Sequence, residues 1–249
     1  MMRFDVITLF PEMVRDAAGY GVTGSAIQRG IVDLAVWNPR DYTQDRHRSV
    51  DDRPYGGGPG MVMKVEPVRD AIRAARADSL IPAEVVFLSP QGDRLTQDAM
   101  NGFAACERMI LLAGRYEGVD QRLVDSEVDE EWSIGDYVLS GGELAALIVI
   151  DAVTRLLPNV LGHTESARQD SYMHGLLDFP HYTRPAAIDG MTVPEVLLSG
   201  DHRAIQRWRM QQALGKTWLR RPDLLKDATL SAEEKKLLEE FIDQHVEGG

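Results

Sequence analysis

The sequence predicts an α/β protein with a mostly parallel sheet, followed by a small all-helical domain. Through the first two-thirds of the chain, short apolar segments rich in β-formers alternate with segments of helical spacing, which is the pattern of a parallel sheet covered by helices. Beyond Pro194 the apolar spacing becomes wholly helical. The chain has 249 residues, 44% hydrophobic and 27% charged, which is enough for one large domain and a small one.

Four segments have the composition of buried strands and are bounded by turn residues or charges. They are residues 3–10, 31–37, 84–89 and 108–114. Two stretches between them, 66–79 and 96–107, have helical spacing, and Thr96 is a suitable N-cap for the second of these. The order of these segments predicts βα units in the first part of the chain.

Two polar stretches interrupt this pattern. Residues 38–60 carry four arginines and four aspartates and end in PYGGGPG. A connection of this length is either a functional loop, such as a lid, or a solvated surface loop, and the sequence leaves both open. Residues 158–175 follow the most apolar helical segment and are typical of an interdomain linker.

Charge is distributed unevenly along the chain, whose net charge is −12. Residues 201–226 have a net charge of +5 and contain Trp208 and Trp218, which indicates a phosphate-rich partner such as nucleic acid. An equal alternative is that the tryptophans are core residues and the arginines are merely solvated. Residues 115–136 have a net charge of −6, which suits a cationic small molecule.

Several classes of site are excluded or disfavoured. The single cysteine, Cys106, excludes an internal disulfide and a multi-cysteine zinc site and fits a reducing compartment. The N-terminus lacks the pattern of a signal peptide and no apolar run could span a membrane, so we expect a cytoplasmic protein. GYGVTG (19–24) and GKT (215–217) resemble nucleotide-binding motifs, but neither follows a predicted strand directly. We therefore expect GYGVTG to form a helix-to-helix turn, and we interpret the resemblance of GKT as a coincidence. The histidine spacing indicates no metal site.

Three turns are predicted at strand ends: residues 87–92, 112–122 and 133–142. Ligands of open parallel sheets bind in the crevice beyond the carboxyl ends of the strands, so these turns predict a binding site. Ser140 and Glu143 have the spacing of a capping box, which would start a helix at Gly141 and Gly142. The two glycines would then leave the helix N-terminus open for a ligand.

The content and order of five motifs closely resemble the bacterial tRNA (guanine-N1)-methyltransferases of the TrmD family, in the SPOUT class of knotted methyltransferases. The motifs are FDVITLFPEM, YGGGPGMVM, LLAGRYEGVDQR, SIGDYVLSGGE and TRLLPNVLG. The resemblance extends over almost the whole chain. It implies that the three turns form a deep trefoil knot, which periodicity alone does not indicate.

The resemblance also implies a cofactor, a division into domains and a partner subunit. S-adenosyl-L-methionine would bind in the knotted domain, residues 1–160, and a flexible linker, 161–175, would lead to a helical tRNA-binding domain, 176–249. The family forms homodimers with a shared active site, and the apolar segment 142–157 suits burial in an interface or a core. The cofactor-binding residues carried over are Leu88, Ser89, Pro90, Gly114, Tyr116, Ile134, Gly135, Asp136, Tyr137, Val138, Leu139, Gly141 and Gly142.

The reaction implied is methylation of N1 of the guanine at tRNA position 37, next to the anticodon. N1 carries a proton that a base must remove, and negative charge then develops toward O6. By the resemblance Asp170 is the base and Arg155 stabilises O6, although an arginine also suits the negative end of a helix. Glu117 is expected to contact the guanine or to orient Arg155. Mg²⁺ is expected by analogy, and no carboxylate cluster allows a site to be assigned.

The RNA partner would be the anticodon stem-loop, whose target base must turn out of its stack to react. Arg203, Arg207 and Arg209 are the RNA-binding candidates, and the first two lie four residues apart on one helix face. Two other classes of function are alternatives to this one. A non-catalytic RNA-binding protein would have no use for Asp170, and a nicotinamide oxidoreductase would depend on GYGVTG alone.

Overall fold

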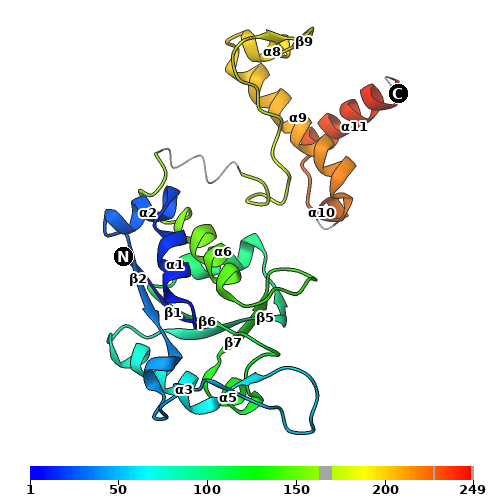
Figure 1. Ribbon diagram of the computed structural model, residues 1–249. Helices are drawn as coiled ribbons and strands as arrows, with labels where there is room; N and C mark the ends of the chain where they lie inside the picture. The colour runs from blue at the N-terminus through cyan, green and yellow to red at the C-terminus, as the bar shows by residue number, and fades with distance from the viewer. Residues whose placement is uncertain (163–169, 227, 248–249) are drawn as a thin grey trace. The chain divides into compact units, whose positions relative to one another are not determined.

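The computed structural model describes residues 1–162, 170–226 and 228–247 (Figure 1). The chain divides into two compact units, Met1–Gly162 (unit 1) and His163–Gly249 (unit 2). Each unit is described by itself. Within the described ranges, no helix is long and apolar enough to cross a membrane.

Unit 1 is built on a five-stranded sheet of order β2-β1-β6-β5-β7, in which every neighbouring pair is parallel. The strands are β1 (Met2–Ile7), β2 (Val32–Trp37), β5 (Glu84–Arg94), β6 (Arg108–Ala113) and β7 (Glu130–Ser133). The α/β prediction is therefore confirmed. The first four strands lie where apolar segments predicted them, whereas β7, with the sequence EEWS, has no apolar run.

Helices cover both faces of this sheet (Figure 1). The central strand β6 sends Met109 and Leu111 into one core and Ile110 and Leu112 into the other. Because both faces are buried, β6 is a continuous apolar run in the sequence. The first core includes α1 (Pro11–Ala18), α2 (Gly21–Gln28), α4 (Gln97–Ala104) and α6 (Glu143–Thr154), and the second includes α3 (Val65–Ala77) and α5 (Gln121–Glu127).

Two local predictions for unit 1 are confirmed. The Thr96 side chain accepts a hydrogen bond from Ala99 N at 3.3 Å and so caps α4. GYGVTG begins in the turn between α1 and α2 and continues into the first half of α2, so it is not a loop after a strand. Gly24 packs against the backbone of Gly19, since a Cβ at Gly24 would lie 2.1 Å from Gly19 O. These glycines therefore serve a close helix packing.

The stretch 38–60 is more structured than its composition indicates. It contains a 3₁₀ helix, η1 (Pro39–Tyr42), and β3 (Asp51–Asp52), which pairs antiparallel with β4 (Val62–Met63). Between these two strands Tyr55 is fully exposed, and Gly56, Gly57 and Gly58 all have positive φ angles. The tip is thus an exposed glycine turn on a paired base.

Helix α6 is apolar on two sides. Ala146, Val149 and Ile150 are fully buried in the first core, whereas Leu144 and Ile148 are 48% and 46% exposed. This segment is apolar nearly all round because one apolar face packs in the core and a second apolar face is exposed. An exposed apolar face of this kind is typical of an interaction surface.

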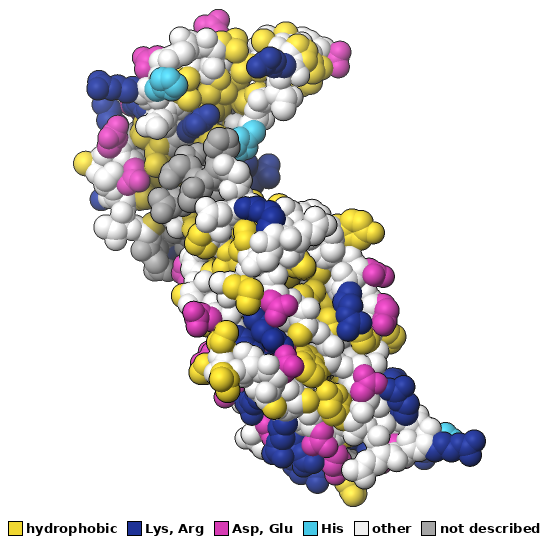
Figure 2. Space-filling view, turned by 90° about the vertical axis from the view of Figure 1, so that its left-hand side faces the viewer, with side chains coloured by type: hydrophobic (Ala, Val, Ile, Leu, Met, Phe, Trp, Pro, Cys, Tyr) yellow, Lys and Arg dark blue, Asp and Glu magenta, His cyan; other side chains and the backbone are white. Residues whose placement is uncertain are grey.

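The charges of unit 1 are interspersed on the face drawn in Figure 2. Acidic and basic side chains lie between hydrophobic ones, and neither sign forms a continuous field there. The net charge of −12 is therefore a poor guide to what this face would bind, and local groups matter more.

Unit 2 is mainly helical, with α8 (Glu195–Leu198), α9 (His202–Arg220), α10 (Pro222–Lys226) and α11 (Ala232–Glu247). It also contains a short hairpin of β8 (Ala187–Ile188) and β9 (Met191–Thr192), whose two turn residues have positive φ angles as tight hairpin turns require. GKT lies inside α9, where a Cβ at Gly215 would be 2.3 Å from the Phe241 ring. The resemblance of GKT to a phosphate loop is a coincidence.

Candidate active site

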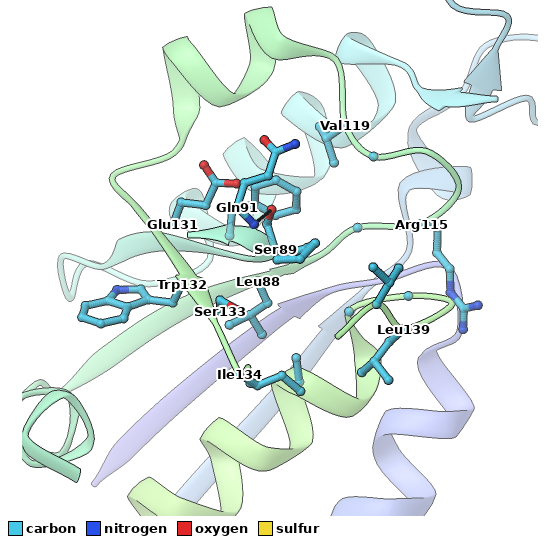
Figure 3. A pocket seen from close by; sticks show the side chains of 18 of the residues that line it. Leu88, Ser89, Gln91, Arg115, Val119, Glu131, Trp132, Ser133, Ile134 and Leu139 are labelled. Atoms are coloured by element: carbon cyan, nitrogen blue, oxygen red, sulfur yellow. Dashed lines mark hydrogen bonds between the residues drawn. The ribbon is translucent and has the colours of Figure 1, made fainter. Parts of the chain in front are cut away.

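A cavity of about 300 Å³ opens in unit 1 at the carboxyl ends of β6 and β7 and beside the irregular middle part of β5 (Figure 3). Segments 112–122 and 133–142 contribute to it beyond the ends of β6 and β7, as the rule for parallel sheets requires. Residues 87–92 also contribute, but the prediction of a turn there is wrong, because they lie within β5 where its pairing with β7 is irregular. Asp136 is exposed and does not belong to the lining. The predicted residues that line the cavity are Leu88, Ser89, Pro90, Gly114, Tyr116, Glu117, Ile134, Gly135, Tyr137, Val138, Leu139, Gly141 and Gly142.

The two glycines before α6 bring two of the turns into backbone contact. Gly142 N donates to Gly114 O at 2.8 Å, and Gly141 forms an isolated antiparallel bridge with Arg115. A Cβ at Gly142 would lie 2.8 Å from Cα of Ala113. The glycine pair is therefore needed because one main chain lies directly against another at the cavity wall.

The expected capping box at the start of α6 is wrong. Gly142 is the N-cap and makes no side-chain cap. Glu143 is only 1% exposed, and its Oε1 accepts from Thr8 Oγ1 at 2.8 Å. Its Oε2 lies 2.9 Å from Arg115 Nε. The buried carboxylate neutralises Arg115 instead of turning back toward Ser140, because an arginine without a counter-charge there would be costly.

Arg115 joins the turns at the edge of the cavity, as Figure 3 shows. Its Nη1 donates to Ser140 O at 3.0 Å, and its guanidinium lies 4.3 Å from the Phe10 ring centre. Arg115 and Glu143 were not among the predicted site residues. The available signal was a carboxylate at the start of the most apolar helix, which predicts a buried partner.

The turn after β7 is held by local hydrogen bonds. Gly135 N donates to Ser133 Oγ at 3.2 Å, and Tyr137 N donates to Gly135 O at 2.9 Å. Gly135 has a φ of +146°, a conformation that side chains rarely adopt. The Trp132 ring points away from the cavity in Figure 3 and packs edge-on against Phe103 at 5.7 Å. This turn therefore offers mainly main-chain groups to a ligand.

Glu117 lies where the end of the 38–60 loop meets the cavity rim. Glu117 N donates to Met61 O and Met63 N donates to Gly118 O, both at 2.9 Å. A Cβ at Gly60 would be 2.3 Å from Glu117 Oε1. The sequence did not predict this contact, and the glycines of PYGGGPG are the signal that could have indicated it.

The cavity surroundings are acidic. Glu117 and Glu131 line it, and Asp120 caps α5 just beyond it. The pKa of Asp120 is lowered because the Arg122 side chain donates to its carboxylate. A carboxylate-rich rim favours a cationic ligand. Among the described residues, no group of three or more His, Cys, Asp or Glu could hold a metal ion.

The structure does not bring the three predicted catalytic residues together in one unit. Glu117 lies in the cavity lining of unit 1. Arg155 is the half-buried C-cap of α6, where its N–H donates to Asp151 O at 3.1 Å, and it does not belong to that lining. Asp170 lies in unit 2, where it lines a different cavity. Residues 163–169 of the predicted linker lie outside the described residues.

The three predicted RNA-binding arginines lie on α9 in different surroundings. Arg203 is exposed in the first turn of the helix, whose N-cap is Asp201. Arg207 Nη2 contacts both carboxylate oxygens of Glu240, at 2.8 and 2.7 Å. Arg209 lies over the Phe179 ring, 4.8 Å from its centre. Of these three arginines, Arg203 alone is exposed and has no ion pair or ring contact among the described residues.

Comparison with known proteins identifies the family. The family model described as "tRNA (Guanine-1)-methyltransferase TrmD" matches residues 2–227. The chain belongs to the TrmD family. The resemblance stated from the motifs is therefore confirmed, while the threading of the knot stays a prediction.

Curated relatives of the TrmD family match over nearly their whole lengths. The tRNA (guanine-N(1)-)-methyltransferase of Methylococcus capsulatus is 68% identical over 240 residues, which is 96% of each chain. That of Halorhodospira halophila is 63% identical over 243 residues, covering 98% of this chain and 92% of the relative. That of Shewanella woodyi is 58% identical over 248 residues and covers 100% of both.

Proposed function

We propose that the chain transfers a methyl group from S-adenosyl-L-methionine to N1 of the guanine at position 37 of tRNA, next to the anticodon. Full-length relatives named tRNA (guanine-N(1)-)-methyltransferases support the reaction. The observation that carries the proposal is the cavity of unit 1, because two of the motifs that resemble the TrmD family, LLAGRYEGVDQR and SIGDYVLSGGE, contribute to its lining.

The lining residues fit this cofactor. A volume of about 300 Å³ suits a small molecule. Leu88, Ile134 and Leu139 offer an apolar wall for adenine, and main-chain groups of the 133–142 turn can bind its polar edge. Glu117 and Glu131 suit a positive charge. When bound, S-adenosyl-L-methionine supplies a methyl group on a cationic sulfur.

The residues of the chain supply the proton chemistry. Asp170 removes the N1 proton of guanine, which frees the N1 lone pair for attack. Arg155 donates to O6, where negative charge develops, and Glu117 contacts the base or orients Arg155. Asp170 belongs to unit 2, and Arg155 and Glu117 belong to unit 1.

The test is mass spectrometry of nucleosides from unmodified tRNA incubated with S-adenosyl-L-methionine. Wild type should produce 1-methylguanosine, and a tRNA with adenosine at position 37 should yield none. Asp170→Ala should abolish the product, whereas Asp243→Ala, which removes an exposed carboxylate of unit 2, should not. A protein that binds tRNA without forming 1-methylguanosine would be a non-catalytic RNA-binding protein, and the proposal would be wrong.

We also propose a homodimer with a shared active site. The exposed apolar face of α6, with Leu144 and Ile148, supports an interface of this kind. Ile148→Glu should shift the protein toward monomer in analytical ultracentrifugation. If one site takes Arg155 and Asp170 from different subunits, then mixing inactive Arg155→Ala and Asp170→Ala proteins should restore part of the activity. No recovery after subunit exchange would argue against shared sites.

The linker is proposed to order when tRNA binds. Of residues 158–175, the described parts are 158–162, which belong to unit 1, and 170–175, which fold in unit 2. Ordering on binding lets RNA contacts bring Asp170 to the base and helps to reject wrong substrates. Hydrogen exchange across the linker should slow with cognate tRNA, and unchanged exchange would contradict this part of the proposal.

The proposed setting is the cytoplasm, with the anticodon stem-loop as partner and Mg²⁺ as a requirement by family analogy. Dialysis against a chelator should lower activity on tRNA, and added Mg²⁺ should restore it. Since Mg²⁺ also supports tRNA folding, the same comparison is made on a short anticodon stem-loop. Full activity of the chelated enzyme on that RNA would remove Mg²⁺ from the reaction.

A further inference from the structure

Helix α2 contains most of GYGVTG and lines neither of the two described cavities. Its Ala26 is fully buried in the first core, where Val149 and Val153 of α6 also lie. Gly24 allows α2 to begin close to the end of α1, because a Cβ at Gly24 would collide with the backbone of Gly19. The motif therefore fixes the place of α2 next to α6.

Two side chains of α2 contact the chain on either side of Arg155. Before it, the buried hydroxyl of Thr23 donates to Asp151 Oδ1 at 3.1 Å. After it, Arg29 Nη2 donates to Asn159 O at 2.6 Å. Asp151 and Asn159 stand four residues before and four residues after Arg155. The arginine assigned to guanine O6 therefore lies midway between two points that one neighbouring helix holds.

The contact after Arg155 fixes the backbone where the chain leaves α6. Asn159 has a φ of +63°, in the left-handed region that asparagine adopts more readily than most side chains do. Arg29 Nη1 also donates to Val160 O at 3.4 Å, so one guanidinium holds two successive carbonyls. Val160 is itself buried in the first core. The course of the chain after Arg155 is thereby defined.

The contact before Arg155 acts on a side chain. Arg155 N donates to Asp151 O at 3.1 Å in the helical pattern, so the two side chains leave the same face of α6 one turn apart. The hydrogen bond from Thr23 fixes the direction of the Asp151 carboxylate. An anion held one turn away limits the directions that the Arg155 guanidinium can take. Such a limit matters because a donor stabilises developing charge only from a fixed position.

We propose that Thr23 and Arg29 are positioning residues for methyl transfer, which hold Arg155 in the direction of guanine O6. The inference rests on the proposed function, because that function assigns O6 to Arg155. Thr23 sets the direction of the side chain through Asp151, and Arg29 sets the backbone through Asn159. Loss of either contact should slow the chemical step and leave the binding of donor and RNA unchanged, since a small misplacement of a reacting group lowers the rate.

The test uses the full-length protein and an anticodon stem-loop RNA with either guanosine or 6-thioguanosine at the target position. Sulfur accepts hydrogen bonds more weakly than oxygen, so the thio base reports on the contact at O6. We compare wild type with Thr23→Val, which removes the hydroxyl, and with Thr23→Ser, which keeps it. Thr154→Val is the matched control, because the buried Thr154 hydroxyl has no hydrogen-bond partner among the described residues.

Arg29 is tested in the same way. Arg29→Ala removes the guanidinium, whereas Arg29→Lys keeps a cation that can bind one carbonyl. Arg15→Ala, at an exposed position of α1, is the control for these two variants. Single-turnover rates at saturating donor and RNA are measured together with affinities for S-adenosylhomocysteine and RNA. Hydrogen exchange across residues 151–162 reports on the backbone around Arg155, and circular dichroism verifies the fold of each variant.

Thr23→Val and Arg29→Ala should lower the single-turnover rate on the normal RNA about tenfold, within the range for a misplaced reacting group. Wild type should be slower on the thio RNA, and these two variants should lose less from the thio substitution because their contact with O6 is already weak. Thr23→Ser and Arg29→Lys should recover part of the rate, and both controls should behave like wild type. Exchange across residues 151–162 should be faster in Thr23→Val and Arg29→Ala alone.

Unchanged rates in Thr23→Val and Arg29→Ala would overturn the inference. A thio loss that is absent from wild type, or equal in wild type and the two variants, would overturn it too, because α2 would then support the fold without directing Arg155. If wild type forms 1-methylguanosine and these variants match it, the proposed function stands and only this inference fails. If wild type forms no 1-methylguanosine, the proposed function fails and this inference fails with it.

Discussion

Arg115 Nε and Glu143 Oε2 lie 2.9 Å apart and form a buried ion pair beside the cavity of unit 1, which Arg115 lines. Neither atom has a hydrogen-bond partner among the described residues, so opposite charge holds the pair together. Glu143 also accepts from Thr8, which follows β1, and Arg115 follows β6. One carboxylate therefore links two strand ends to the start of α6.

Replacing Glu143 should destabilise unit 1. Glu143→Gln can keep the hydrogen bond from Thr8 but leaves Arg115 largely buried without a counter-charge, which costs about 3 kcal/mol. Chemical denaturation measures the loss, and calorimetry should show weaker binding of S-adenosylhomocysteine because Arg115 no longer holds the 133–142 turn. Glu12→Gln, at an exposed position, should change stability by less than about 0.5 kcal/mol. Equal stability of the two variants would mean that the ion pair contributes nothing.

Two glycine substitutions should have opposite effects. In Gly142→Ala the new Cβ would lie 2.8 Å from Ala113 Cα and 3.0 Å from Gly114 N, so one main chain must move. We expect a loss of about 1–3 kcal/mol and weaker cofactor binding. Gly102→Ala adds the same methyl group in α4 with nothing within 4 Å, and should stabilise by about 0.5–1 kcal/mol. Thermal unfolding compares them, and a stabilised Gly142→Ala would show that the turns are not in close contact.

The capping boxes illustrate what the sequence could predict and what it could not. Ser140 and Glu143 have the same spacing as Ser231 and Glu234, yet only the second pair forms the reciprocal bonds, at 2.8 and 3.2 Å. The difference is tertiary, since Glu143 is drawn into the core by a charge that follows another strand. Residue spacing predicts only local geometry, so it could not predict that Arg115 lies next to Glu143.

The same distinction applies to the rest of the fold and site. Buried strands such as β6 were predictable because both faces need apolar side chains, and the edge at which the turns meet follows from parallel strands. Strand β7 was missed because its pairing with β5 does not depend on an apolar run. The contact between Met61 and Glu117 joins segments that are distant in sequence, and the glycines of PYGGGPG indicate a close approach there without naming its partner.

The capping box of α11 makes a prediction about pH. The pKa of Glu234 is lowered, chiefly because Ser231 N–H donates to its carboxylate. A carboxyl whose pKa is lower in the folded state stabilises the fold above its unfolded pKa of about 4.3, and this stabilisation is lost as the pH falls through the folded pKa. The free energy of unfolding of wild type should therefore exceed that of Glu234→Gln by about 0.5–1 kcal/mol at neutral pH, and this difference should shrink in acid.

Thermal unfolding between about pH 3 and pH 7 measures this difference. Glu239→Gln is the control, because it removes the same charge from an exposed position of α11 outside the capping box. The stability of Glu239→Gln relative to wild type should change little with pH. A gap between wild type and Glu234→Gln that stays constant with pH would mean that the charge of Glu234 does not strengthen the cap.

The ion pair between Arg207 and Glu240 makes a prediction about RNA binding. Both carboxylate oxygens of Glu240 in α11 contact Arg207 Nη2. The guanidinium that the proposed function assigns to an RNA phosphate is therefore already paired with a carboxylate. Binding of RNA must then break this pair or proceed without Arg207. Glu240→Gln removes the competing charge, and it should raise the affinity for the anticodon stem-loop and increase the magnitude of the salt slope by about one.

Affinities measured over a range of salt concentrations give the slope. Replacing both Arg203 and Arg207 with Gln should weaken RNA binding and reduce the slope. The affinity for S-adenosylhomocysteine should stay unchanged, because the cavity proposed to bind it belongs to unit 1. Glu239→Gln, next to Glu240 but without an ion pair among those described, separates the effect of net charge from release of Arg207. If it raises affinity as much as Glu240→Gln does, the acidic helix acts only through its overall charge, and Arg207 does not contact RNA.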